Sequence, residues 1–121
     1  MSKTVSHNLD YRQNILDELR KALASYFSLR SGEVRQLLSN LLLSIEAECM
    51  ILEKYASNRE DPNYSFALES LVMVGKRLRS PFLQERTSSL TSTDSDQDIR
   101  DAIDDFLKDI RDIRSLHAQQ S

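Results

Sequence analysis

Apolar residues recur at every third or fourth position along four stretches of the chain, a pattern typical of amphipathic α-helices. In the most regular stretch, Ile99, Ile103, Phe106, Ile110 and Ile113 follow the 4-3-4-3 spacing of a coiled-coil or bundle seam. Four such helices joined by short connections predict an all-α fold, an antiparallel four-helix bundle. The predicted helices cover about residues 9–29, 33–57, 62–80 and 96–116.

Glycine, proline and capping residues set the predicted helix boundaries. Gly32 can adopt the left-handed backbone that ends a helix, and Ser31 can cap the next helix. Asp61 followed by Pro62 predicts a helix start, because the carboxylate accepts hydrogen bonds from unsatisfied N–H groups and proline has no N–H to satisfy. Pro81 disfavours helical backbone at the residue before it, so we expect the third helix to stop or kink there.

The chain is expected to form one domain with irregular segments around it. Residues 87–95 contain seven serines or threonines in nine positions. Such hydroxyl side chains compete for backbone hydrogen bonds, so we predict a flexible loop there. The predicted organisation is a flexible N-terminus over 1–8, a single helical-bundle domain over 9–116 and a C-terminal tail over 117–121.

The composition supports a small helical protein. The 121 residues are 40% hydrophobic and 29% charged, as in globular domains, and the two glycines and two prolines are too few for the turns of an all-β fold. The single cysteine excludes a disulfide framework. The longest stretch without a charge, residues 36–45, is half the roughly 20 residues of a membrane span. Without an export signal, the expected location is the cytoplasm, with the nucleus as the alternative.

Charge is distributed unevenly along the chain. The net charge is −3, but residues 94–121 carry eight aspartates against four basic residues and so account for −4. The remainder is close to neutral, at +1. This asymmetry predicts polar contacts between elements or with a partner, and the acidic balance argues against nucleic acid as that partner.

The sequence lacks the residue patterns that usually bind metals or cofactors. The two histidines, His7 and His117, lie near the chain ends, outside any Glu-x-x-His motif for a di-metal centre and any mid-helix position for phosphotransfer. A haem-attachment motif and a glycine-rich phosphate loop are missing from the sequence. We therefore expect no metal and no cofactor.

Catalytic residues are equally hard to find. Cys49 falls on the apolar side of its helix and is expected to act as a small buried hydrophobe rather than as a reactive thiol. Glu48 borders the same apolar side and is expected to reach solvent or an arginine. These features predict a protein that is not an enzyme. The competing hypothesis is an enzyme whose site assembles from Glu46, Glu48 and Glu53 around a metal.

The most informative pattern is apolar residues on the outer side of two helices. Leu43 and Met50 lie about 180° from the core side of helix 33–57, and Phe66 and Met73 do the same on helix 62–80. Methionine suits adaptable binding surfaces. These four residues predict an association surface on a protein–protein interaction module: an adaptor, a regulator, a small subunit of a complex or a chaperone-like binder. The simplest partner is a second copy, giving a homodimer. The alternative is that the two helices are central and pack these residues internally, or that the bundle is merely irregular and the residues are exposed singly.

A basic cluster near the end of the third helix supports a second hypothesis. Lys76, Arg77, Arg79 and Arg86 could contact an acidic partner or, in a nucleic-acid-associated subunit, phosphates. The simpler interpretation is that these cations only stabilise the C-terminus of the third predicted helix. The run Arg77-x-Arg79-Ser80-Pro81 also resembles a phosphorylation site at Ser80.

Overall fold

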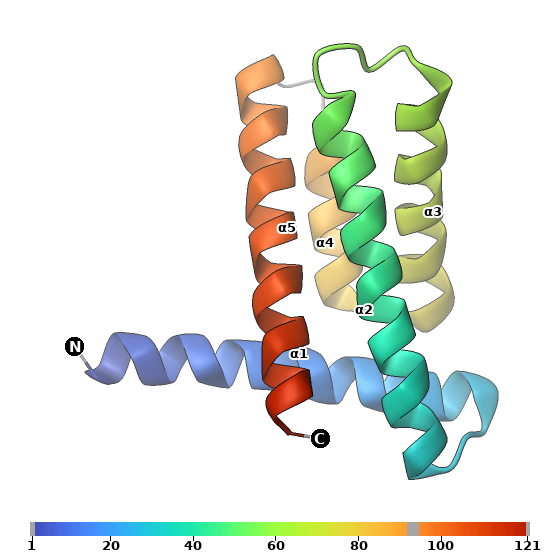
Figure 1. Ribbon diagram of the computed structural model, residues 1–121, viewed down its shortest axis with the longest axis vertical. Helices are drawn as coiled ribbons and strands as arrows, with labels where there is room; N and C mark the ends of the chain where they lie inside the picture. The colour runs from blue at the N-terminus through green and yellow to red at the C-terminus, as the bar shows by residue number, and fades with distance from the viewer. Residues whose placement is uncertain (1, 92–94, 121) are drawn as a thin grey trace.

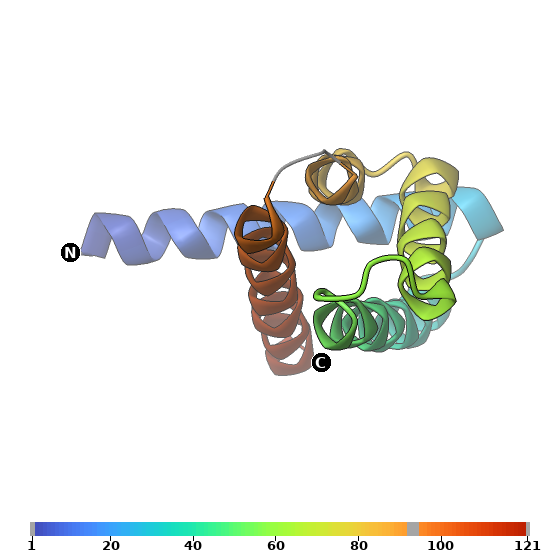
Figure 2. The same ribbon diagram turned by 90° about the horizontal axis from the view of Figure 1, so that it is seen from above.

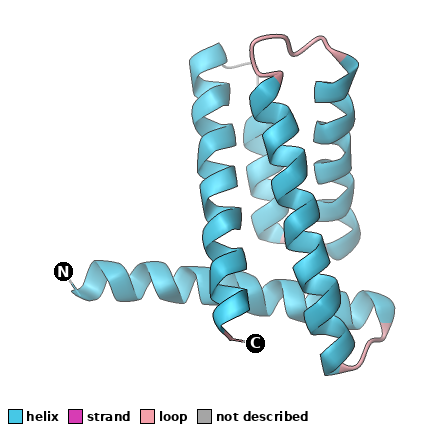
Figure 3. Ribbon diagram, viewed as in Figure 1, coloured by secondary structure: helices cyan, strands magenta, loops and turns pink. Residues whose placement is uncertain are grey.

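The computed structural model describes residues 2–91 and 95–120, and this part of the chain contains helices and short connections (Figure 3) but no strand. The all-α prediction is therefore confirmed. No helix in these ranges combines the length and apolar character that crossing a bilayer requires. The five helices are α1 (Ser2–Phe27), α2 (Ser31–Lys54), α3 (Pro62–Leu78), α4 (Pro81–Leu90) and α5 (Asp96–Gln119).

Four of the helices stand side by side and the first crosses them. Helices α2 to α5 alternate in direction and form a ring in chain order, while α1 lies across their lower part and extends past α5 (Figures 1 and 2). The predicted antiparallel four-helix bundle is thus confirmed only as an all-helical packing, because the structure has five helices and segment 9–29 belongs to the crossing one. A crossing helix can bury its apolar side against several helices at once, and α1 contacts α2, α3 and α5. The side chains that it buries are Ile15, Leu16, Leu19 and Leu23.

Helix α4 occupies a segment that was predicted in part as a loop. Ser80 caps it by accepting a hydrogen bond from the Leu83 N–H at 3.2 Å, and Pro81 supplies its first residue. The hydroxyl of Thr87 donates to the Leu83 carbonyl at 2.9 Å, so it adds to the helix instead of competing with it. The prediction of a loop over 87–95 is wrong for residues 87–90; residues 92–94 lie outside the described part of the chain.

The turn between α1 and α2 does not use glycine. Helix α1 ends at Phe27; the next residue, Ser28, has a left-handed φ of 53°, and the Leu29 N–H donates to the Ala24 carbonyl at 3.2 Å. This is the hydrogen bond of a Schellman motif. Helix α2 begins at Ser31 after Arg30, whose N–H donates to the Glu33 carboxylate at 3.2 Å.

The predicted roles of Gly32 and Ser31 are therefore wrong. Gly32 lies in the first turn of α2 with a negative φ, and Ser31 is the first helical residue rather than the cap. The left-handed residue lies four positions earlier than expected, at Ser28 instead of Gly32. The end of α3 repeats this geometry, with Arg79 at a φ of 53° and the Ser80 N–H donating to the Gly75 carbonyl at 3.1 Å.

Both terminal segments are more helical than predicted. Helix α1 starts at Ser2, so the backbone of 2–8 is helical where a flexible N-terminus was expected. Helix α5 continues to Gln119 and so includes most of the predicted tail over 117–121. In α5 the extension includes His117, which is buried.

The core is centred on the predicted seam of α5. All five seam residues are buried, and the Phe106 ring contacts the Phe82 ring of α4 edge to face, with 6.0 Å between centroids. At Gly75 the two helices α3 and α4 approach so closely that a Cβ there would lie 3.2 Å from the Cβ of Leu83. Cys49 is fully buried, as predicted.

Replacing Phe106 or Ile110 by alanine should lower the free energy of unfolding by about 2–5 kcal/mol, because each change leaves a cavity in the centre of the core. Urea unfolding followed by circular dichroism measures this loss. Lys108→Ala changes an exposed position of the same helix and should have little effect. Equal effects at Phe106 and Lys108 would show that α5 does not dock as described.

Replacing Ser28 by glycine should stabilise the protein by about 0.5–1 kcal/mol, because a left-handed backbone is costly for residues with a Cβ. The control is Ser25→Gly, an exposed position inside α1, which should destabilise by a similar amount. Thermal unfolding of the two variants measures the difference. The same sign for both changes would contradict the turn geometry.

Candidate functional site

All four residues of the predicted association surface are exposed. The exposed fractions are 50% for Leu43, 49% for Met50, 67% for Phe66 and 48% for Met73. The alternative that the two helices pack these side chains internally is therefore wrong. Together with Tyr11, Tyr26 and Phe27 on α1, they are the large apolar side chains left at the surface of the described chain.

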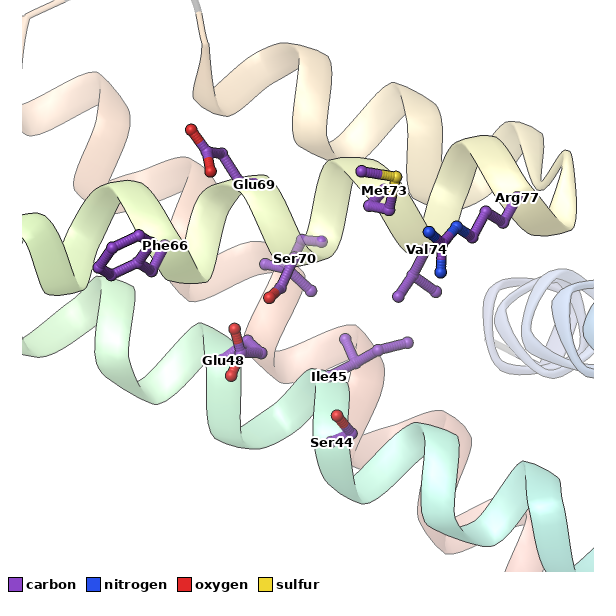
Figure 4. Close-up of a pocket in the computed structure, with 10 residues that line it drawn as sticks. Ser44, Ile45, Glu48, Phe66, Glu69, Ser70, Met73, Val74 and Arg77 are labelled. Atoms are coloured by element: carbon purple, nitrogen blue, oxygen red, sulfur yellow. The ribbon is translucent and has the colours of Figure 1, made fainter.

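An open groove of about 470 Å³ runs between α2 and α3 and contains one of the two predicted pairs. Phe66 and Met73 line it from α3 (Figure 4). Leu43 and Met50 do not line it: at 100° per residue they lie on the outward side of α2, with the exposed Ala47 between them and the groove. The structure thus brings two of the four residues into one groove and leaves the other two beside it.

Three charged residues share this groove, of which only Glu69 was absent from the sequence predictions, where Glu48 and Arg77 were assigned to other features. Glu48 of α2 and Glu69 and Arg77 of α3 line it together with Phe66 and Met73. In Figure 4 the charged groups of α3 lie on either side of Met73, with Glu69 toward Phe66 and Arg77 at the far end. The 4-3-4 spacing of Phe66, Ser70, Met73 and Arg77 was the signal that could have identified the whole stripe.

The predicted basic cluster does not form one surface. Arg77 lines the groove between α2 and α3, whereas Lys76 lines a separate hollow between α3 and α4. Arg79 forms the left-handed end of α3. Arg86 is paired with Asp109 of α5, stacks over the Phe82 ring at 5.4 Å and donates to the Tyr11 hydroxyl at 3.3 Å.

Ser80 is inaccessible in the folded protein. Its side chain is fully buried, and its hydroxyl donates a hydrogen bond of 2.5 Å to a carboxylate oxygen of Glu18 on α1. The same hydroxyl accepts the capping hydrogen bond from Leu83. A kinase that recognises Arg77-x-Arg79-Ser80-Pro81 therefore cannot reach the hydroxyl while α1 is docked.

The three glutamates of the competing enzyme hypothesis point to different places. Glu46 forms ion pairs with Arg111 at 2.8 Å and Arg114 at 2.6 Å, and its side chain is only 12% exposed. Glu48 lines the groove toward α3, and Glu53 faces Asp104 of α5. Over the described ranges, no group of three or more His, Cys, Asp or Glu side chains is arranged to hold a metal ion.

Cys49 lies close to these carboxylates but is held as a thiol. Burial and the negative charges of Glu48 and Glu46 raise the pKa of Cys49 to about 12. The thiolate is the nucleophilic form, so this cysteine is inert near neutral pH.

Comparison with known proteins identifies no relative: no protein-family model, curated protein or solved structure matches this chain.

Replacing Glu53 by glutamine should raise the melting temperature near neutral pH. A hydrogen bond with the Asp104 carboxyl, followed by burial and the Asp104 charge, raises the pKa of Glu53 above its ordinary value of 4.5. A raised pKa adds stability below pH 4.5 that is lost as the pH rises through the folded value.

The advantage of Glu53→Gln should therefore shrink as the pH falls toward and below 4.5. Thermal unfolding across this pH range measures it, with Glu60→Gln, an exposed residue of the connection between α2 and α3, as the charge-matched control. A gain of the same size in the control would show that net charge, not the Asp104 contact, is responsible.

Proposed function

We propose that this protein is a non-enzymatic interaction module, an adaptor, regulator or small subunit of a complex, that binds a protein partner through α2 and α3. The observation that supports this is the set of four large apolar side chains, Leu43, Met50, Phe66 and Met73, each about half exposed or more on these two neighbouring helices. Fully burying one such side chain is worth roughly 1.5–3 kcal/mol, so covering the surface would release considerable free energy.

The shape of the surface favours a helix as the partner element. A groove between two helices accepts the apolar face of a third helix, and flexible methionines adapt to it. Phe66 and Met73 line such a groove, seven residues apart on α3. A partner helix with apolar residues at the same spacing would contact both.

A second copy of the chain is the partner that the charges favour. Glu69 and Arg77 lie four residues before and four residues after Met73 on α3, and all three line the groove. If two copies of α3 cross antiparallel at Met73, each Arg77 meets Glu69 of the other copy. One patch then serves both subunits, as in the two-fold dimers that dominate among soluble oligomers.

The alternative of a nucleic-acid-associated subunit has less support. It requires Lys76, Arg77, Arg79 and Arg86 to face the same phosphates, but they are distributed over two grooves, a helix end and an internal ion pair. Binding through phosphates would weaken steeply with salt, whereas apolar helix packing would not. For its location we propose the cytoplasm, with the nucleus as the alternative, since a chain with one cysteine has no internal disulfide that would need an oxidising compartment.

Light scattering of the purified protein should give about twice the chain mass of 13.9 kDa. Met50→Lys combined with Phe66→Lys should give a folded monomer, because it places two charges in the apolar contact. Tyr26→Lys, at an exposed aromatic residue of α1, should leave the dimer intact.

Charge exchange then tests the pairing itself. Glu69→Arg and Arg77→Glu should each weaken the dimer, and the double variant should restore it because the opposite charges meet again. A wild type that is monomeric would rule out the second copy. If, in addition, a helical partner captured by the wild type bound equally well to the Met50 and Phe66 variant, the proposed surface itself would be wrong.

A further inference from the structure

A second hollow, of about 560 Å³, lies where α1, the start of α2 and the end of α5 meet. Its polar lining consists of Arg20 and Lys21 from α1, Arg35 from α2, and His117 and Gln120 from the end of α5. The positively charged side chains thus come from two helices. We call this hollow the basic pocket.

The charge of the basic pocket is opposite to that of the whole chain. Among the residues that the structure describes, three cationic side chains, Arg20, Lys21 and Arg35, line it without any carboxylate, although the protein carries a net charge of −3. Asp17 contacts Arg20 at 3.5 Å but is not part of the lining. Over the described ranges, the side chains of Lys21 and Arg35 form no ion pair. Like charges gathered in this way repel one another unless an anion lies between them.

Besides Asp17, neutral groups hold the Arg20 side chain in place. Nη2 of Arg20 donates to the Gln120 Oε1 at 2.9 Å and lies 3.3 Å from Nδ1 of His117. On the other side of the ring, Nε2 of His117 lies 3.2 Å from the Arg35 carbonyl oxygen and 3.1 Å from the Ser39 hydroxyl. An imidazole that donates from Nε2 to the Arg35 carbonyl has Nδ1 available to accept from Arg20.

This arrangement requires His117 to be neutral, and its surroundings favour that form. Burial is the largest cause of the lowered pKa of His117; the hydrogen bond to the Arg35 carbonyl opposes it, and the charges of Arg20 and Arg35 lower the pKa further. A neutral histidine orients the Arg20 guanidinium without cancelling its charge. Arg20 is thus pre-organised by Asp17, His117 and Gln120, while Lys21 and Arg35 have no ion-pair partner among the described residues.

The rest of the lining is apolar. Ala24, Leu29 and Val34 complete the wall, and the half-exposed Phe27 follows Ala24 on the same side of α1. A ligand that fits both parts combines an anionic group with an organic portion.

We propose that the basic pocket binds the phosphate group of a phosphorylated small molecule or of a lipid headgroup. Guanidinium groups match the geometry of phosphate oxygens, and an ammonium group adds a third donor and a third positive charge. Three cations converging on one place exceed what a single carboxylate needs, whereas a phosphate monoester carries close to two negative charges. The pocket lies apart from the groove between α2 and α3, so this inference does not depend on the proposed partner.

The test is titration with inorganic pyrophosphate, followed by the imidazole C–H signals of His117 in NMR spectra, with His7 as the reference signal. We expect a saturable shift of His117 alone. Lys21→Gln combined with Arg35→Gln should weaken binding by about tenfold or more, the effect of losing a hydrogen bond to a charged group. Lys54→Gln combined with Lys108→Gln removes the same charge at other exposed positions and should bind as the wild type does.

Vesicles identify the source of the phosphate. Co-sedimentation with phosphatidylcholine vesicles that contain phosphatidic acid, lost in the Lys21 and Arg35 variant, would identify a lipid headgroup; a response to pyrophosphate alone would identify a soluble phosphorylated molecule. The inference is overturned if neither probe binds the wild type, or if the two double variants weaken binding equally. Circular dichroism and the unliganded His117 signals verify that the variants are folded.

Discussion

The seam of isoleucine and phenylalanine on α5 makes the contacts around which the other helices are arranged. Its five residues are buried, and α5 packs against α1, α2 and α4. Phe106 joins this seam to α4 through the Phe82 ring. Without the seam, α2 and α4 would lose one of their two common neighbours, and α1 would lose one of the helices that it crosses. The surface groove and the basic pocket both depend on this arrangement, because it sets where α1, α2 and α3 meet.

The polar sides of α5 explain the uneven charge of the chain. Asp109 pairs with Arg86 of α4, Asp112 with Arg12 of α1 and Asp96 with Arg59 before α3. In two further ion pairs α5 supplies the cation: Arg111 and Arg114 both pair with Glu46 of α2. Three of the eight aspartates of the C-terminal segment are therefore paired with arginines elsewhere in the described chain. Partly exposed ion pairs contribute little stability each, so their main effect is to favour one register of α5 among its neighbours.

The sequence predicts those parts of the fold that local spacing encodes. The seam of α5 and the apolar side of α2 repeat every three or four residues, and both are buried as expected. Helix α4 was missed because it is short and rich in hydroxyl residues, whose hydrogen bonds to their own helix only the structure reveals. The crossing of α1 was missed because a periodic pattern specifies which side of a helix is buried but not the direction of its axis.

The same limit applies to the candidate sites. Exposure of Leu43, Met50, Phe66 and Met73 followed from their angle to the core, and the structure agrees. Which of them share a groove depends on the register of α2 against α3. The periodicity of a single helix does not specify this register. The basic pocket is even harder to predict from the sequence, because it brings together Arg20 and His117, which are 97 positions apart.

Because the Ser80 hydroxyl is hydrogen-bonded to Glu18 of α1, the accessibility of Ser80 depends on whether α1 is docked. The hydroxyl becomes available only when α1 detaches from the junction of α3 and α4, so any enzyme that modifies it competes with the re-docking of α1. The rate of modification is then governed by the free energy of that local opening rather than by the recognition motif around the serine. A phosphate, once added, could not return to a buried site opposite a carboxylate, and the covalent mark would hold the helix in its detached position.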